Sequence, residues 1–297
     1  MIHKLFRAVT KVLPDKAYLS LKYRLKFGEK MPWEKPVTFN QKLQWLKLYD
    51  RKPEYSRMVD KYEAKIYVAE KIGEEYTIPT LGIWDKFDDI DFNTLPDKFV
   101  LKCTHDCGSV ILCKDKSTFD IERAKKKLDC AMKKNYYYGE REWAYKSVKP
   151  RIIAEEYMED EKTAELRDYK FFCFNGEAKM LFIATDRQTK GEETKFDFFD
   201  MEYNHLPFTN GHPNAKVLPE KPLCFDEMRA LAEKLSAGIP HLRVDFYEVN
   251  GKVYFGELTF FHFGGFVKFN SEEWDEKIGE WVDLSVLIKK LEGHKVL

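Results

Sequence analysis

The chain has 297 residues, enough to bury a large core and to divide into two or three lobes. Its 50 basic residues balance its 50 acidic ones, so no overall field indicates a nucleic acid partner. Aromatic residues make up 15% of the sequence, which excludes a disordered chain. No apolar run approaches the roughly 20 residues that span a bilayer. No signal-peptide pattern is present, so we expect a cytosolic protein whose six cysteines are reduced.

The first 30 residues depart from this neutrality, because eight basic residues stand against two acidic ones, a net charge of +6. Leu5, Val9 and Val12 lie near helical spacing with basic residues between them. This pattern fits a helix resting on the anionic inner face of a membrane. It also fits an ordinary packed helix with a solvated basic face, and both interpretations stay open.

Helix signals dominate the section that follows. A helix is expected over 41–49 with Thr38 or Asn40 as its cap, and a second helix over 54–72. These elements predict a mostly helical region over residues 1–98.

Two short apolar strands are predicted at 99–103 and 110–113, joined by the loop 104–109. A short loop that contains glycine can turn its backbone N–H groups toward an anion, and Lys102 is placed to reach the same anion. An ordinary hairpin turn is the alternative. The Walker A spacing is absent. A zinc site is a further alternative, although the spacing differs from the usual pairs; its ligands would be Cys103, His105, Cys107 and Cys113.

The next section predicts a basic helix over 119–134, an aromatic and polar connection over 135–149, and a strand over 150–158. This strand runs from apolar residues into two acids. Its end can offer backbone groups to a flat heterocycle, with apolar and aromatic side chains as walls.

A further strand over 167–174 ends at a turn formed by Asn175 and Gly176, and it directs Asp168 and Lys170 to one face. Residues 186–223 are predicted to be a polar, loop-rich insertion, since they hold four prolines. Helical periodicity returns over 225–236.

A late β-hairpin is predicted over 243–259 with its turn at Asn250–Gly251. Alternation of side chains allows Asp245 and Glu257 to meet beside Arg243. Facing carboxylates repel one another, and two hard oxygen ligands suit Mg²⁺ carrying substrate phosphates. A solvent-exposed charged face is the ordinary alternative.

Five motifs now stand in one order along the chain: 99–102, 104–106, 168–176, 243–245 and 255–260. This set resembles ATP-grasp proteins of the teichuronopeptide-biosynthesis type, which occur with bacterial capsule and surface-polysaccharide genes and are often labelled glycosyltransferases. The resemblance covers nearly the whole chain from Thr38 onward. It implies an α+β protein in which a small lobe over 99–158, with the phosphate loop, and a large lobe over 159–297 grip ATP.

The resemblance also implies a role for each matching residue. Lys102 and Lys61 would contact phosphates together with the loop residues His105, Gly108 and Ser109. The hinge that holds adenine would be Glu155, Glu156, Tyr157 and Met158, and Asp168 would contact the ribose. Lys170 and Arg243 would stabilise an acyl phosphate. Asp245 and Glu257 would bind Mg²⁺, helped by Thr259, which stands where many ATP-grasp ligases have asparagine.

This resemblance predicts an ATP- and Mg²⁺-dependent carboxylate–amine ligase that joins an amine, such as an amino acid, to a uronic acid of a surface glycan or its precursor. A glycosyltransferase is one alternative, supported locally by the acid-x-acid pattern at Asp89–Ile90–Asp91. A sugar or small-molecule kinase on the same scaffold is another, and a glycan-binding protein without activity is a third. The insertion 186–223 and the aromatic segment 260–266 are expected to form the acceptor pocket, with His262 either a general base or a packed core residue.

Overall fold

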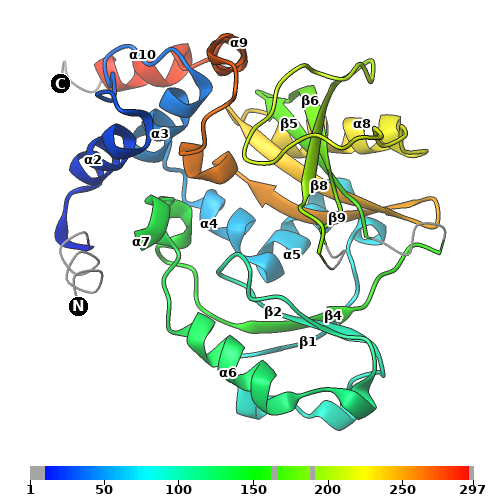
Figure 1. The fold of residues 1–297 in the computed structure, drawn as a ribbon. Coiled ribbons are helices and arrows are strands. Elements are labelled where there is room, and N and C mark those ends of the chain that lie inside the picture. The colour runs from blue at the N-terminus through cyan, green and yellow to red at the C-terminus, as the bar shows by residue number, and fades with distance from the viewer. Residues whose placement is uncertain (1–10, 162–165, 188–190, 294–297) are drawn as a thin grey trace.

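A computed structural model gives the protein structure and describes residues 11–161, 166–187 and 191–293. Two antiparallel sheets with surrounding helices form it, which confirms the expected α+β class. The small sheet lies at the bottom of Figure 1 and the large sheet at the upper right, with α4 and α5 between them. Leu5 and Val9, on which the membrane interpretation rests, lie outside the described residues. None of the described helices combines the length and apolar character needed to cross a bilayer.

The small sheet has the strand order β1-β4-β2-β3. Its strands are β1 (Thr80–Trp84), β2 (Phe99–Cys103), β3 (Ile111–Cys113) and β4 (Ile152–Glu156). Helix α6 (Ile121–Met132) covers one face, and its apolar residues Ala124 and Leu128 pack against Phe99 and Leu101 in a core of their own. The predicted pairing of 99–103 with 110–113 is confirmed with one residue fewer in the second strand.

The large sheet has the order β7-β6-β5-β8-β9, with helix α8 (Phe225–Ser236) packed on it. Its strands are β5 (Asp168–Phe174), β6 (Glu177–Thr185), β7 (Lys195–Asp200), β8 (Leu242–Val249) and β9 (Lys252–Thr259). Both predicted hairpin turns are confirmed. Asn175 and Asn250 have φ near +50° and are followed by glycines, as two-residue turns require. Strand β7 lies within 186–223, so that range is not loop throughout: its alternating Phe196 and Phe198 join the core.

The single helix expected over 54–72 is wrong: the structure has α4 (Glu54–Val59) and α5 (Lys61–Ile72), separated at Asp60. Asp60 adopts an extended backbone, and its carboxylate accepts hydrogen bonds from the N–H groups of Tyr62 and Glu63 at 2.9 and 3.2 Å. An aspartate that caps the second helix in this way ends the first. The new N-terminus of α5 lies at the loop 104–109, where the Lys61 N–H donates to the Thr104 carbonyl oxygen.

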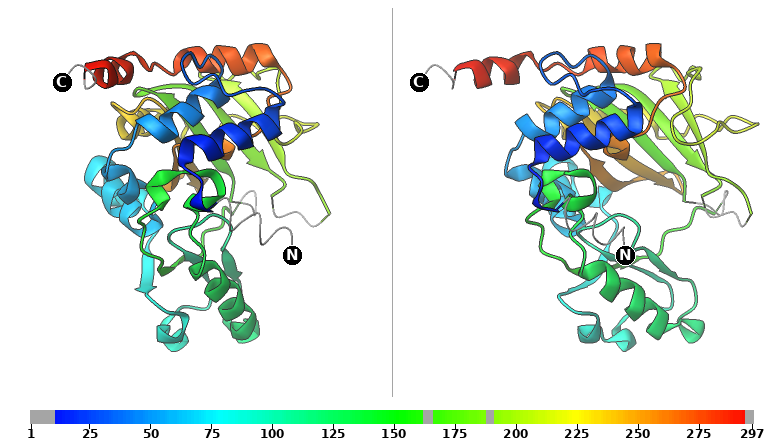
Figure 2. Two further views of the ribbon diagram at one scale, coloured as in Figure 1. Left: turned by 90° about the vertical axis from the view of Figure 1, so that its left-hand side faces the viewer. Right: turned by 60° about the vertical axis from the view of Figure 1, so that its left-hand side comes forward.

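A layer of helices lies at the top of both views in Figure 2: α2 (Asp15–Phe27), α3 (Phe39–Tyr49), α9 (Glu272–Trp281) and α10 (Ser285–Gly293). Thr38 caps α3 in a reciprocal capping box with Gln41, which decides between the two predicted caps. Helix α9 approaches the start of α3 so closely that a Cβ at Gly279 would lie 2.3 Å from the Val37 carbonyl oxygen.

Short 3₁₀ turns connect these elements. They are η1 (Glu74–Tyr76), η2 (Phe87–Asp89), η3 (Phe92–Thr94), η4 (Lys116–Thr118), η5 (Trp143–Tyr145) and η6 (His262–Gly265).

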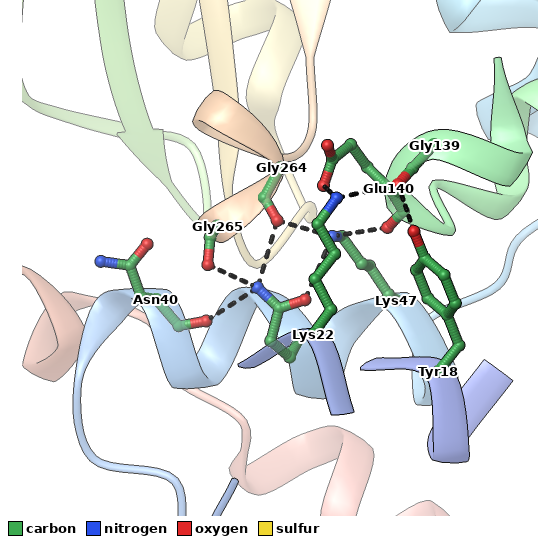
Figure 3. A network of polar contacts seen from close by, with 9 residues as sticks. Tyr18, Lys22, Asn40, Lys47, Gly139, Glu140, Gly264 and Gly265 are labelled. Atoms are coloured by element: carbon green, nitrogen blue, oxygen red, sulfur yellow. Dashed lines mark hydrogen bonds and ion pairs between the residues drawn. The ribbon is translucent and has the colours of Figure 1, made fainter. Parts of the chain in front are cut away.

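The connection from α6 to β4 crosses from the small sheet to the helical layer through α7 (Tyr137–Glu140) and η5. A buried lysine holds it there. Lys47 is 0% exposed, and its ammonium donates to Gln44 Oε1 at 3.1 Å, to the Glu140 carbonyl at 2.8 Å and to the Gly264 carbonyl at 2.6 Å (Figure 3). Gly265 has φ +64°, and a Cβ there would lie 2.4 Å from Gln44 Nε2, so only glycine permits this close packing.

Replacing Lys47 with methionine should lower the free energy of unfolding by about 2–4 kcal/mol, because buried carbonyl oxygens would lose their donor. Urea unfolding followed by circular dichroism measures the change. Lys42→Met is the matched control on the same helix, since Lys42 is half-buried and makes one hydrogen bond, to the Val282 carbonyl. Equal losses in both variants would contradict a special role of Lys47.

Candidate active site

The middle of the large sheet holds a line of buried charges on β5 and β8. Lys170 is 8% exposed and donates to Asp168 Oδ1 at 3.0 Å and to Asp245, which is 1% exposed. Burial lowers the pKa of Lys170, an effect that Asp245 opposes. Burial alone would raise the pKa of Asp245, but Arg243 and Lys170 outweigh it and lower this pKa. Asp245 is therefore a carboxylate held ionised by two cations.

Arg243 contacts three other side chains in this row of buried charges. Its guanidinium donates Nε–H to Asp245 Oδ1 at 2.7 Å and Nη2–H to Asp245 Oδ2 at 2.8 Å, a bidentate pair that also fixes its plane. Nη2–H also reaches Thr259 Oγ1 at 3.0 Å. Nη1 lies 2.9 Å from His262 Nδ1.

His262 orients this arginine. Since Nη1 can only donate, Nδ1 of His262 is the acceptor, and Nε2–H then points to Asn210 Oδ1 at 3.0 Å. Burial, followed by the charge of Arg243, lowers the pKa of His262 well below its ordinary value. The ring is a buried neutral residue with both nitrogens engaged, so the general-base interpretation is not supported and the packed one is.

The predicted pairing of the two candidate metal carboxylates is confirmed, since Asp245 faces Glu257 in the β8–β9 register. Glu257 is half-buried, and no hydrogen bond or ion pair to its carboxylate is found among the described residues. Asp245 Oδ1 accepts one N–H group, so lone pairs remain on both carboxylates. This donor set of hard oxygens fits Mg²⁺. Thr259 lies beside Arg243, to which its hydroxyl oxygen is bonded.

A second cluster of charges lies on the small sheet. Glu155 is 5% exposed and accepts Lys65 Nζ–H at 2.8 Å and Lys102 Nζ–H at 2.5 Å. Burial alone would raise the pKa of Glu155, and the two lysines overcome this and lower it. The Glu155 side chain therefore positions the ammonium of Lys102, and the contact of this hinge with adenine stays a prediction. Of the other hinge candidates, Glu156 is exposed, Met158 is half-buried, and Tyr157 lies under the ammonium groups of Lys98 and Lys114.

The loop 104–109 is anchored at both ends. Lys61 Nζ donates to the Asp106 carbonyl oxygen. Ser109 Oγ donates to Asp106 Oδ1 at 2.6 Å and accepts the Cys103 N–H at 2.8 Å. Gly108, at φ +97°, has open space around it. The contacts of Lys61 and Ser109 hold the loop in one conformation and leave Gly108 open.

His105 connects this loop with α6. The ring is 2% exposed, and Nε2 lies 3.3 and 3.1 Å from the carbonyl oxygens of Ala131 and Lys134 at the end of α6. It fastens the loop to that helix through Nε2, while Nδ1 has no hydrogen-bond partner among the described residues, so the contact of His105 with phosphate stays a prediction.

A family model described as TupA-like ATPgrasp matches residues 41–283. The chain belongs to the TupA-like ATP-grasp family. The ATP-grasp fold expected from the resemblance is therefore confirmed. None of the curated protein sequences matches the chain.

Solved ATP-grasp structures resemble it distantly. A D-alanine–D-alanine ligase from Bacillus anthracis complexed with ATP is 14% identical, with 68% of this chain and 54% of that chain covered and a TM-score of 0.40. The ATP-grasp ligase PsnB complexed with minimal precursor, Mg and ADP is 12% identical, with 74% and 57% covered and a TM-score of 0.40. D-alanine–D-alanine ligase from Helicobacter pylori is 15% identical, with 74% and 61% covered and a TM-score of 0.39. This chain spans little more than half the length of these proteins.

The structure gives no support to two alternatives raised by the sequence, the glycosyltransferase pattern and the zinc site. Asp91 caps the short turn η3 by accepting the Asn93 N–H at 2.9 Å, so the acid-x-acid pattern is part of a local turn. Cys103 and Cys113 are buried thiols that lie near the carbonyl oxygens of Leu128 and Asp97. In the described part of the chain no group of three His, Cys, Asp or Glu residues could hold a metal ion.

Sequence reasoning did not assign three charged residues of the candidate site. Lys65 lies one helical turn after Lys61, and this i,i+4 spacing was a usable signal. Arg187, which forms an ion pair with Asp168, follows β6 and had no signal. Glu142, the residue just before η5, also had none: it is 5% exposed, and burial raises its pKa to about 7, an effect that Lys47 opposes.

This perturbed carboxyl predicts a pH dependence of stability. The pKa is higher in the folded than in the unfolded chain, so the stability that Glu142 contributes is present below about pH 4.5 and is lost as pH rises through about 7. Relative to wild type, Glu142→Gln should gain on the order of 2–3 kcal/mol between pH 5 and 8. Urea unfolding across this range measures it, with Glu140→Gln as the control. A difference that does not change with pH would contradict the assignment.

Proposed function

We propose that the protein is an ATP- and Mg²⁺-dependent carboxylate–amine ligase that acts through an acyl phosphate. The observation that carries this proposal is the Asp245–Glu257 pair, set face to face on β8–β9, in which Asp245 is also bonded to Arg243 on its own strand. Membership of the ATP-grasp family supports ATP as the nucleotide. The lysines in the two clusters provide positive charges for the phosphates of ATP.

The residues would act by position and charge. Lys102, held by Glu155, and Lys170, held between two aspartates, would bind phosphate oxygens. Asp245 and Glu257 would hold Mg²⁺, which when bound neutralises charge on the β- and γ-phosphates. Arg243, its plane fixed by Asp245 and His262, would face the acyl phosphate with preorganised N–H donors.

The proposed reaction has two steps. An oxygen of the substrate carboxylate attacks the γ-phosphorus, and ADP leaves with the electron pair of the broken P–O bond. The nitrogen of a neutral amine then attacks the acyl carbon of the acyl phosphate. The C–O bond to phosphate breaks, inorganic phosphate leaves with that electron pair, and the nitrogen loses one proton to give the amide.

The substrate class in this proposal is a uronic acid of a bacterial capsular or surface polysaccharide, or its precursor, together with an amino acid or other amine. The teichuronopeptide-type resemblance motivates this choice. The proposal includes a cytoplasmic location, because the reaction consumes ATP, and contact of the basic N-terminal segment with the inner face of the membrane.

Product analysis tests the proposal. Purified protein is incubated with Mg²⁺, ATP, glucuronic acid or its oligomers, and a set of amino acids, and ADP and phosphate are measured separately. A ligase releases both, in equal amounts, only when acid and amine are present together. ADP without phosphate and with a phosphorylated sugar would show a kinase. Turnover of a nucleotide sugar without ATP would show a glycosyltransferase, and neither reaction would favour a binding protein.

A further inference from the structure

The large sheet carries the row of buried charges and a group of aromatic rings on the same face. In the strand registers, Lys170 of β5 lies opposite Asp245 of β8 on one side and opposite Phe182 of β6 on the other. Phe182 in turn lies opposite Phe198 of β7, and Phe196 precedes Phe198 by two residues. Directly paired residues share a face, as do alternate residues of one strand. Phe196 therefore lies on the face that bears Lys170 and Asp245.

Helix α8 packs against the opposite face of this sheet. Phe171, which alternates with Lys170 and Phe172, has its ring centroid 5.8 Å from that of Phe225 on α8. A substrate that contacts the charged side chains therefore binds on the face that also bears Phe196.

Phe263, in η6, forms an aromatic cluster with Phe196 and His212. The rings of Phe263 and Phe196 are stacked, with centroids 6.0 Å apart and an angle of 11° between their planes. The His212 centroid lies 4.3 Å from that of Phe196. Phe196 is 8% exposed, whereas Phe263 is 36% exposed. The cluster thus holds one aromatic ring at the protein surface, on the side of the sheet that bears the charges.

The backbone of Phe263 has a conformation that bulky residues rarely adopt. Its φ of +48° lies in the left-handed region, which disfavours a phenylalanine side chain. Gly211 makes room for the ring, because a Cβ there would lie 2.8 Å from Phe263 Cε2. Burial of the ring does not explain this unfavourable backbone, since the ring stays partly exposed. Backbone outliers and exposed apolar groups both gather at binding sites.

Two routes of direct contact join the aromatic cluster to Arg243. On the first, Arg243 Nη1 lies 2.9 Å from His262 Nδ1, and the ring centroids of His262 and Phe263 are 4.4 Å apart. On the second, the Arg243 guanidinium lies 5.8 Å from the Phe182 centroid, which is 4.4 Å from that of Phe196. One ring separates Arg243 from the cluster on each route, a span that a sugar ring of similar size can cover.

We propose that Phe263, supported by Phe196 and His212, is the subsite on which the pyranose ring of the acid substrate stacks, with its carboxylate directed toward Arg243. This inference rests on the proposed ligase function and names the residue that selects a sugar acid. A pyranose ring presents C–H groups that suit an aromatic face, while its hydroxyl groups stay hydrated at the rim. Nη1 of Arg243 has a second N–H group besides the one given to His262, and this donor can bind a carboxylate.

Phe263→Leu removes the aromatic face and keeps an apolar side chain at the same position. With ATP, Mg²⁺ and hydroxylamine, which traps an acyl phosphate as a hydroxamate, the KM for glucuronic acid should rise about 5- to 20-fold with a smaller change in kcat. Phe263→Tyr keeps the ring, so its KM should stay within about twofold of wild type. An unchanged KM in Phe263→Leu, or an equal rise in both variants, would overturn the subsite.

Phe92→Leu is the matched control. Phe92 is a half-buried ring in η3, where it contacts Phe99 in the separate core of the small sheet. The KM for glucuronic acid should stay within about twofold of wild type, because distant sites act independently. The same rise as in Phe263→Leu would mean that any loss of a ring weakens binding, and it would also overturn the subsite.

Saturation-transfer NMR with methyl β-D-glucuronide keeps this test separate from the ligase assignment, because it measures binding without turnover. In the presence of Mg²⁺ and a non-hydrolysable ATP analogue, irradiation of the protein's aromatic protons should transfer saturation to the pyranose C–H groups in wild type and Phe263→Tyr, and much less in Phe263→Leu. Transfer in wild type without release of ADP and phosphate in the product assay would refute the ligase and leave the subsite standing. No transfer in wild type, or equal transfer in Phe263→Leu, would overturn the subsite.

Discussion

Glu257→Gln should reduce ATP-dependent product formation by at least about 100-fold while leaving the unfolding midpoint in urea close to that of wild type. The fold is spared because Glu257 is half-buried and its carboxylate is not bonded within the described residues, so the change removes charge without removing a contact. Activity is lost because a neutral amide is a poor ligand for Mg²⁺ beside Asp245 and leaves phosphate charge uncompensated.

The matched control is Glu177→Gln, an exposed strand carboxylate at the far turn of β6, for which wild-type activity is expected. Calorimetry with Mg²⁺ and a non-hydrolysable ATP analogue gives a second measurement, in which Glu257→Gln should show weakened magnesium-dependent binding. Full activity in Glu257→Gln would remove this residue from the metal site.

Arg243→Met should lose both activity and stability. Methionine approximates the length of the arginine stem but leaves Asp245 buried with Lys170 as its remaining cation, which should cost about 3 kcal/mol in the free energy of unfolding. Turnover should fall by about 100-fold or more, since a donor aimed at developing charge is lost.

His262→Phe tests the orientation of Arg243 while the charge of Arg243 is kept. It preserves the aromatic packing against Phe172 but removes the acceptor at Nδ1, so it should lower kcat with a smaller loss of stability than Arg243→Met. The measurements are urea unfolding and the rate of ADP release. Wild-type stability in Arg243→Met would contradict the central position given to this arginine.

Local patterns were sufficient to predict most of the strands and both hairpin turns of the large sheet. The pairing of Asp245 with Glu257 followed from alternation and from the position of Asn250–Gly251, both of which act within a few residues. The helix 225–236 was predicted with its observed bounds, because its apolar period is regular.

Contacts between residues far apart in the sequence could not be predicted from local sequence patterns. The division at Asp60 depends on a cap that also receives Arg151 Nη2–H at 3.0 Å, from 91 residues away. His105 was assigned by its place in a loop, whereas the end of α6, with which it packs, decides its direction. Glu142 carries no local signature, since the buried cation that acts on it, Lys47, comes from α3, far away in the sequence.

The bonds of Lys47 to the α7 and η6 carbonyls constrain how the small sheet can move. Both ends of the 133–151 connection enter that sheet, at α6 and β4, while its middle is fastened to α3. A movement of the small sheet relative to the helical layer would therefore have to bend this connection on either side of the Lys47 bonds.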